Sequence, residues 1–253
     1  MTIAITREIS PRFAECEITH IERTPIDLDL ARLQHQAYVN TLQELGCSVI
    51  ALPAEPDLPD SVFVEDTAVI LPEVAVITRP GADSRKAETE SIVQVLAPLT
   101  RQIRMQEPAT LDGGDVLVLG KMIYVGLSTR SNQEAIEQLN VMVRDYGYSV
   151  VGVKLDDCLH LKTAVTRVDD RTILINPNWV DPSVFEGFDR IEVEPSEPYA
   201  ANCLPVGGAV IFPTAFPKTC TKLAARGYKI AHVDVSELAK GEGAVTCCSL
   251  VLP

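Results

Sequence analysis

The chain has 253 residues, of which 46% are hydrophobic, and carries 35 acidic against 22 basic side chains for a net charge of −13. A chain of this length can bury a large core, and no linker or low-complexity tract interrupts it, so we expect a single domain over residues 1–253. The charge argues against nucleic acid as a partner, because there is no basic patch to release counterions from phosphates.

Pairs of short apolar runs recur along the chain, and helical spacing follows most of them. Residues 2–6 are typical of a strand, and alternating runs joined by tight turns indicate β-hairpins. Apolar spacing predicts helices over 28–45, 84–96, 132–146 and 217–226, with a short helix near 183–188. The hairpins pair Asp66–Ile70 with Val74–Thr78, Asp115–Leu119 with Met122–Val125, His160–Val165 with Thr172–Ile175, and Asn202–Val206 with Ala209–Phe212.

These units form a repeat. They start near Asp66, Asp115, His160, Asn202 and Cys247, roughly 45 residues apart, which is a propeller-like period. The fifth unit has only its first strand, so residues 2–6 are expected to complete it and close the ring. The predicted fold is therefore α/β, a five-bladed α/β propeller of pseudo-repeated ββαβ units around a central active site. The alternative is an ordinary α+β domain in which the hairpin spacing is coincidental.

The polar residues at the unit starts should converge on the axis of such a ring. Cys247 and His160 are the parts needed for covalent catalysis, with histidine moving the protons. Carboxylates nearby would raise the pKa of a thiol, so they suit a substrate that brings its own positive charge. A guanidinium fits, since carboxylates match its fork of donors. The expected reaction is hydrolysis at a guanidinium carbon, with substrate binding lowering the pKa of the thiol.

The cysteines set limits on compartment and metal content. There are seven, an odd number, and they are not spaced as a disulfide scaffold or as paired zinc knuckles. Cys247 has the alternative of being a buried core thiol like the others. No apolar run approaches a membrane span, and the N-terminal residues lack the apolar region of a signal peptide. We therefore expect a cytoplasmic protein without a membrane partner.

Several stretches carry a resemblance to a known family. The chain resembles the guanidine-modifying enzymes and, within them, the dimethylarginine dimethylaminohydrolase family. The resemblance covers nearly the whole chain and implies the five-bladed α/β propeller, or pentein, already expected. The matching stretches are Asp60–Asp66, Ile77–Ala82 with Ser84–Arg85, Thr110–Asp115, Val125–Asn132, His160–Thr163, Ala200–Cys203 and Val245–Ser249.

The resemblance also implies a role for individual residues. Cys247 matches the nucleophile, His160 the general acid and base, and Asp112 the carboxylate that orients this histidine, where some relatives carry Glu. Gly241-Glu242-Gly243 departs from relatives that tend to have Asp before the glycine, which bears on specificity. The implied substrate-binding residues are the acidic Asp60, Glu65 and Asp66, the carboxylate-binding Arg85 and Arg130, and the apolar Ile18 of a lid segment.

The implied activity is hydrolysis of Nω-methylated L-arginine (asymmetric dimethylarginine or monomethylarginine) to L-citrulline and dimethylamine or methylamine, through a covalent Cys thiouronium intermediate. No cofactor or metal is required, although zinc could bind Cys247 as an inhibitor. The expected partner is this small-molecule substrate, and a homodimer is left open. Two alternatives remain: a deiminase of arginine or another guanidine, and a non-catalytic binder of cationic amino acids.

Overall fold

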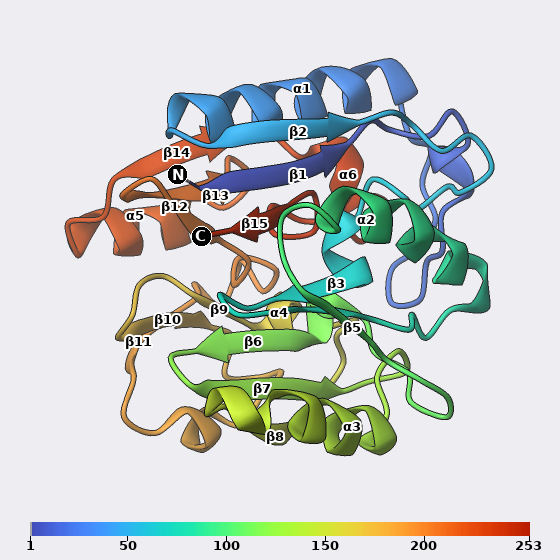
Figure 1. Ribbon diagram of the computed structural model, residues 1–253. Coiled ribbons are helices and arrows are strands. Elements are labelled where there is room, and N and C mark those ends of the chain that lie inside the picture. Colours follow the sequence, from blue (N-terminus) through green and yellow to red (C-terminus); the bar gives the residue numbers. More distant parts are fainter. Residues whose placement is uncertain (1) are drawn as a thin grey trace.

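The computed structural model describes residues 2–253 and contains five sheets of three strands each (Figure 1). In every sheet the middle strand pairs antiparallel with the first strand and parallel with the third. This regularity confirms the ββαβ repeat. The sheets are β15 (Leu250–Leu252), β1 (Ile3–Arg7) and β2 (Ser48–Leu52); β3 (Ala68–Ile70), β4 (Ala75–Ile77) and β5 (Gln102–Arg104); β6 (Val116–Leu119), β7 (Met122–Leu127) and β8 (Ser149–Lys154); β9 (Val165–Arg167), β10 (Thr172–Ile175) and β11 (Asp189–Glu192); and β12 (Leu204–Val206), β13 (Ala209–Pro213) and β14 (Ile230–Val233).

A helical segment connects the second strand of each blade to the third. The predicted helices are present, and side-chain caps explain two of their starts: Asp27 accepts hydrogen bonds from the N–H groups of Asp29 and Leu30, and Asn132 from that of Ala135. The α-helices are α1 (Leu28–Glu44), α2 (Thr89–Leu96), α3 (Gln133–Val143), α4 (Leu161–Ala164), α5 (Pro217–Ala225) and α6 (Ser236–Ala239). The 3₁₀ turns are η1 (Phe13–Glu15), η2 (Val64–Thr67), η3 (Asp83–Glu88), η4 (Gly113–Asp115), η5 (Arg144–Tyr146) and η6 (Pro182–Phe185).

The five blades close into a ring. Residues from all five first strands (β3, β6, β9, β12 and β15) line one axial cavity of about 590 Å³. The N- and C-terminal strands β1 and β15 pair with each other, as predicted, and the ends of the chain lie close together (Figure 1). This pairing completes the fifth blade.

The apolar core is divided among the blades. Buried residues form five clusters, each between two neighbouring blades. Successive strand residues enter different clusters: Val116 of β6 packs on the side of β3 and β4, whereas Leu117 packs toward β9 and β10. This follows from the two-residue period of a strand, and it buries both faces of each sheet.

The predicted starts of four strands are wrong by two residues or more, and the reason bears on the site. The strand expected from Asn202 begins at Leu204. The stretch from His160 to Val165 was expected to be a strand, but residues 161–164 form α4 and the strand begins at Val165. The strand expected from Cys247 begins at Leu250, and the one expected from Asp66 begins at Ala68, after η2. The polar residues therefore lie in turns that precede the strands.

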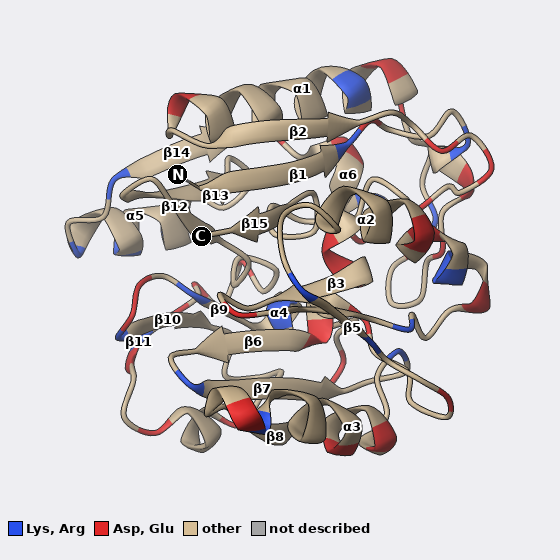
Figure 2. Cartoon of the chain, in the orientation of Figure 1, with Lys and Arg blue, Asp and Glu red and all other residues tan. Residues whose placement is uncertain are grey.

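None of the helices described over residues 2–253 is both long and apolar enough to cross a membrane. Lys and Arg are scattered among Asp and Glu over helices and loops, rather than gathered on one element (Figure 2).

Candidate active site

The five blade starts meet at one end of the axial cavity. A second cavity, of about 220 Å³, is lined by Glu65, Gly114, His160, Asn202 and Cys247, which represent one start each. The turns that carry them also contact one another, since η4 contacts both η2 and α4. The structure therefore brings together the residues that the repeat predicted to converge.

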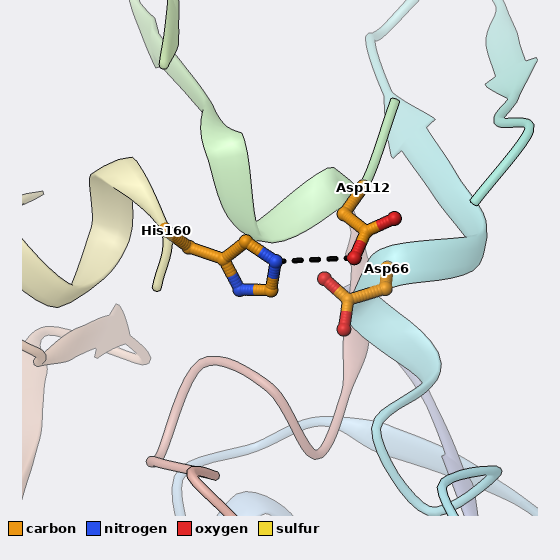
Figure 3. A group of neighbouring side chains, drawn as sticks. All are labelled: Asp66, Asp112 and His160. Atoms are coloured by element: carbon orange, nitrogen blue, oxygen red, sulfur yellow. Dashed lines mark hydrogen bonds and ion pairs between the residues drawn. The ribbon is translucent and has the colours of Figure 1, made fainter. Parts of the chain in front are cut away.

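His160 lies in a cluster of carboxylates. Its Nε2 is 3.1 Å from Oδ2 of Asp112, and both side chains are buried (Figure 3). Burial lowers the pKa of this imidazole, but the negative charges of Asp66 and Asp115 outweigh that effect, and together with Asp112 they raise the pKa to about 9. At neutral pH His160 is therefore an imidazolium with two N–H donors.

The chain around His160 is held by Asp115 and Gly114. Oδ1 of Asp115 accepts a hydrogen bond from the backbone N–H of Leu161 (2.9 Å), directly after the histidine. A Cβ on Gly114 would lie 2.6 Å from Nδ1 of His160 and 2.9 Å from Oδ1 of Asp66. Only glycine leaves room for the imidazole beside this carboxylate.

Asp66 is ionised and paired within the protein. Its Oδ1 accepts the Gly114 N–H (2.8 Å), and its Oδ2 accepts Nη1 of Arg85 (2.6 Å). Burial raises the pKa of Asp66, but the charges of Arg85 and His160 overcome this and lower it to about 2. Arg85 also donates from Nη2 to Glu88 (2.8 Å) and is almost wholly buried. The guanidinium of Arg85, predicted to bind a substrate carboxylate, thus has Asp66 and Glu88 as its ionic partners.

Cys247 lies in the turn before β15 and lines the cavity. Its backbone carbonyl accepts the N–H of Glu65 (3.1 Å), and the N–H of Ala244 donates to its Sγ (3.3 Å). Burial, followed by the charges of Glu65 and Asp66, raises the pKa of the Cys247 thiol well above its ordinary value. The side chain is thus a neutral thiol at neutral pH, which agrees with the charge argument made from the sequence.

A hydrogen-bond network holds the turn that carries Cys247. Oε2 of Glu65 accepts Oγ1–H of Thr246 (2.7 Å), and Oε1 pairs with Nζ of Lys162 (2.6 Å). The amide of Asn202 donates to Oγ1 of Thr246 (3.0 Å) and accepts the Thr246 N–H (3.1 Å). Glu65 and Lys162 line both the axial cavity and the 220 Å³ cavity, so this ion pair separates the two spaces.

Sequence reasoning assigned no role to Lys162, Thr246 or Asn202 in this network. All three lie in stretches used for the family resemblance, and Asn202 also marks a blade start. Their place in these stretches was the signal that could have identified them. Glu65, predicted to hold the substrate, pairs with Lys162 and Thr246 within the protein.

The segment near Ile18 crosses the same end of the ring. Both carboxylate oxygens of Asp60 accept the N–H of Glu17 (3.2 Å each), and Nη2 of Arg130 donates to Oγ1 of Thr19 (3.0 Å). Ile18 is half-buried and packs against the apolar cluster between the fourth and fifth blades. In the described chain it is Ile21, not Ile18, that lines the larger cavity.

Glu242 fastens this segment to the turn that precedes Cys247. Its two carboxylate oxygens accept the backbone N–H groups of Thr19 (2.6 Å) and His20 (2.7 Å). Its own φ is +60°, in the left-handed region that favours glycine. The departure noted in the sequence therefore lies at a contact across the mouth of the site.

A small polar cavity adjoins the larger one. It has a volume of about 20 Å³, and its walls include Asp60, Asp66, Arg85 and Arg130. His160 and Cys247 line both cavities. The thiol and the imidazolium therefore stand between a polar side and a roomier side of the site.

The fold is that of the guanidine-modifying enzymes. A family model described as N,N dimethylarginine dimethylhydrolase, eukaryotic, matches residues 19–182. The chain belongs to the dimethylarginine dimethylaminohydrolase family.

Individual relatives agree over nearly the whole chain. The N(G),N(G)-dimethylarginine dimethylaminohydrolase of Streptomyces coelicolor is 41% identical over 251 residues, which cover 98% of this chain and 96% of the relative. The Pseudomonas aeruginosa enzyme of the same name is 38% identical over 219 residues, 86% of each chain. A solved structure of a cysteine-to-serine variant from that organism, complexed with citrulline, matches with a TM-score of 0.95 at 35% identity over 98% of both chains.

Proposed function

We propose that this protein hydrolyses Nω-methylated L-arginine to L-citrulline and dimethylamine or methylamine. The observation that carries the proposal is the buried His160–Asp112 pair beside Cys247, in a cavity whose polar side holds the Asp66 carboxylate. A nucleophile, an acid and a guanidinium-binding carboxylate are the parts the reaction requires.

The substrate is proposed to bind across the site. Asp66 accepts two N–H groups of the guanidinium, with Glu65 adding negative charge from the floor of the cavity. Arg130, with Arg85 behind it, receives the α-carboxylate. Asp60 faces the α-amino group, and Ile18 belongs to the segment that covers this end. The guanidinium charge lowers the pKa of Cys247, so the thiol releases its proton as substrate arrives.

The chemistry follows from the two protonation states of His160. The thiolate adds to the guanidinium carbon, and the imidazolium protonates the methylated nitrogen as its bond to carbon breaks. This leaves a thiouronium and a neutral imidazole. The imidazole then takes a proton from water as the oxygen adds to the same carbon. The carbon–sulfur bond breaks as the hydroxyl proton passes to the sulfur, which releases citrulline and restores the Cys247 thiol. Asp112 keeps the imidazole oriented in both steps.

Zinc is proposed as an inhibitor and not as a cofactor. His160, Asp112 and Asp66 offer ligand atoms within 4.8 Å of one another, and Cys247 lines the same cavities as His160. Zn²⁺ binding there would occupy the nucleophile and the acid together. Micromolar Zn²⁺ should abolish turnover, and EDTA should restore it.

The test is incubation with asymmetric dimethylarginine, monomethylarginine and arginine, with assays for citrulline and for each amine. Citrulline with methylamines, lost in Cys247→Ser and retained in Cys220→Ser, supports the proposal. Cys220 is the matched control because, among the described residues, it and Cys247 are the two cysteines that are half-buried rather than buried. Ammonia from arginine would make the protein a deiminase, and binding without product from any substrate would make it a binder.

A further inference from the structure

One side of the site is polar and the other is largely apolar. A methylated guanidinium likewise has N–H groups on one side and methyl groups on the other. A carboxylate matches two N–H donors of a guanidinium at once. In asymmetric dimethylarginine the dimethylated nitrogen has no N–H, so Asp66 can pair only with the chain nitrogen and the unsubstituted nitrogen. The methyl groups must then point away from Asp66.

The cavity on the side away from Asp66 is the larger one. Asp66 lines only the 20 Å³ polar cavity, whereas the 220 Å³ cavity begins at His160 and Cys247 and continues outward. Its walls on that side are largely apolar, from Ile21, Tyr199, Ala215, Phe216 and Val235.

The larger cavity is poorly suited to the charged end of the amino acid. The basic residue on its wall besides the imidazolium is Lys162, and its Nζ is paired with Glu65 at 2.6 Å. The arginines suited to a carboxylate, Arg85 and Arg130, lie on the polar side. Because burying an unpaired carboxylate among apolar groups is costly, the amino-acid end belongs with Arg130.

The size of the larger cavity exceeds what two methyl groups need. A water-sized group takes about 30 Å³ of liquid volume, so 220 Å³ has room for about seven such groups. Two methyl groups use about a third of that space, and the guanidinium uses part of the rest, because the 20 Å³ polar cavity is too small for it. The remainder adjoins His160, the group that protonates the departing nitrogen.

We infer that the 220 Å³ cavity is a subsite for the departing amine, and that it accepts N-alkyl substituents of three or four carbons as well as methyl groups. The inference rests on the proposed function. The substrate class is thereby extended to Nω-alkyl-L-arginines, which give citrulline and the corresponding primary alkylamine. Each methylene buried there raises kcat/KM by up to about fourfold, the equivalent of about 0.8 kcal/mol.

The experiment compares Nω-methyl-, Nω-propyl- and Nω-butyl-L-arginine with asymmetric dimethylarginine, by kcat/KM for citrulline. We expect the propyl and butyl substrates to react at no less than about a tenth of the kcat/KM of the methyl substrate. Ala215→Leu narrows the cavity and should lower the butyl-to-methyl ratio at least about tenfold. Ala37→Leu, the same change on the exposed face of α1, is the matched control and should leave the ratio unaltered.

The outcomes separate the inference from the proposed function. Hydrolysis of dimethylarginine without hydrolysis of the propyl or butyl substrates would overturn the subsite and leave the function standing. A butyl-to-methyl ratio that Ala215→Leu does not change would show that the chains lie elsewhere, and this also overturns the assignment. No citrulline from any of the four substrates would refute the proposed function, and the inference with it.

Discussion

Replacing Asp112 by asparagine should move the alkaline limb of the pH–activity profile to lower pH. The proposed leaving-group step needs the imidazolium of His160, so activity falls as pH rises through the pKa of this group, about 9. The Asp112→Asn side chain keeps its size and loses its charge. A hydrogen bond to a charged group contributes about 1.5–3 kcal/mol, and a pKa unit corresponds to about 1.4 kcal/mol, so the pKa of His160 should fall by about 1–2 units.

The assay measures kcat and kcat/KM for citrulline formation from dimethylarginine between pH 5 and 10, and the limb is taken from kcat/KM, which reports the pKa of the free enzyme. We expect the limb of the variant to lie between about pH 7 and 8, with kcat at its optimum lowered about tenfold or more, because the imidazole loses its orienting partner. NMR titration of His160 gives the same pKa independently, since the chain has only four histidines. Asp145→Asn, at an exposed carboxylate, is the control and should leave the limb near 9. A limb that stays near 9 in Asp112→Asn would refute the argument that this carboxylate stabilises the imidazolium.

Four further changes test other parts of the site. Alkylation of the free protein should show that Cys247 is protonated at neutral pH, because burial and nearby carboxylates raise its pKa. In a second assay, a guanidinium ligand should accelerate the reaction of Cys247 with a small haloacetamide. A thiol that is already ionised without ligand would contradict this. Asn202→Ala should slow inactivation by a haloacetamidine about tenfold or more, and should lower the free energy of unfolding by about 1–3 kcal/mol because the buried Thr246 N–H loses its acceptor. Equal inactivation rates in the variant and the parent would deny Asn202 a positioning role. Lys162→Met should lower the free energy of unfolding by about 3–5 kcal/mol, since it leaves Glu65 buried and unpaired, and adding Glu65→Gln should recover much of that loss in a denaturant titration. Glu242→Gln should raise KM severalfold by weakening the contacts to the covering segment, while Glu242→Asp gives a smaller change; identical KM values in both variants and the parent would exclude this contact from substrate binding.

Much of the fold could be predicted because its pattern is repeated. Alternation identified the hairpins, and the five starts predicted the ring. The third strands were not located from the sequence, and β5 and β11 show why. They read Gln-Ile-Arg and Asp-Arg-Ile-Glu, which are too short and too polar to give a clear alternating signal. Helix α4 (161–164) was taken for a strand because four residues are too few to distinguish the two-residue period of a strand from the 3.6-residue period of a helix.

The candidate site was predicted in its composition but not in its pairings. Glu65 and Asp66 were identified as buried charges for a cationic substrate, yet in the structure they pair with Lys162 and Arg85. A carboxylate serves a protein cation and a substrate cation by the same chemistry, so the residue type cannot decide between them. Only the fold, which brings Lys162 to Glu65 across 97 positions of sequence, shows the partner.

The pairing of β1 with β15 also has a consequence for the order of folding. The registers join Ile3 to Leu252 and Ile5 to Leu250, so this blade requires closure of a loop that includes nearly all of the described chain. Contacts between residues so distant in sequence carry the largest entropic cost and tend to form late. Cys247 stands three residues before β15 and takes its place only with that strand. During refolding, regain of activity should therefore lag behind regain of secondary structure, and its rate reports closure of the ring.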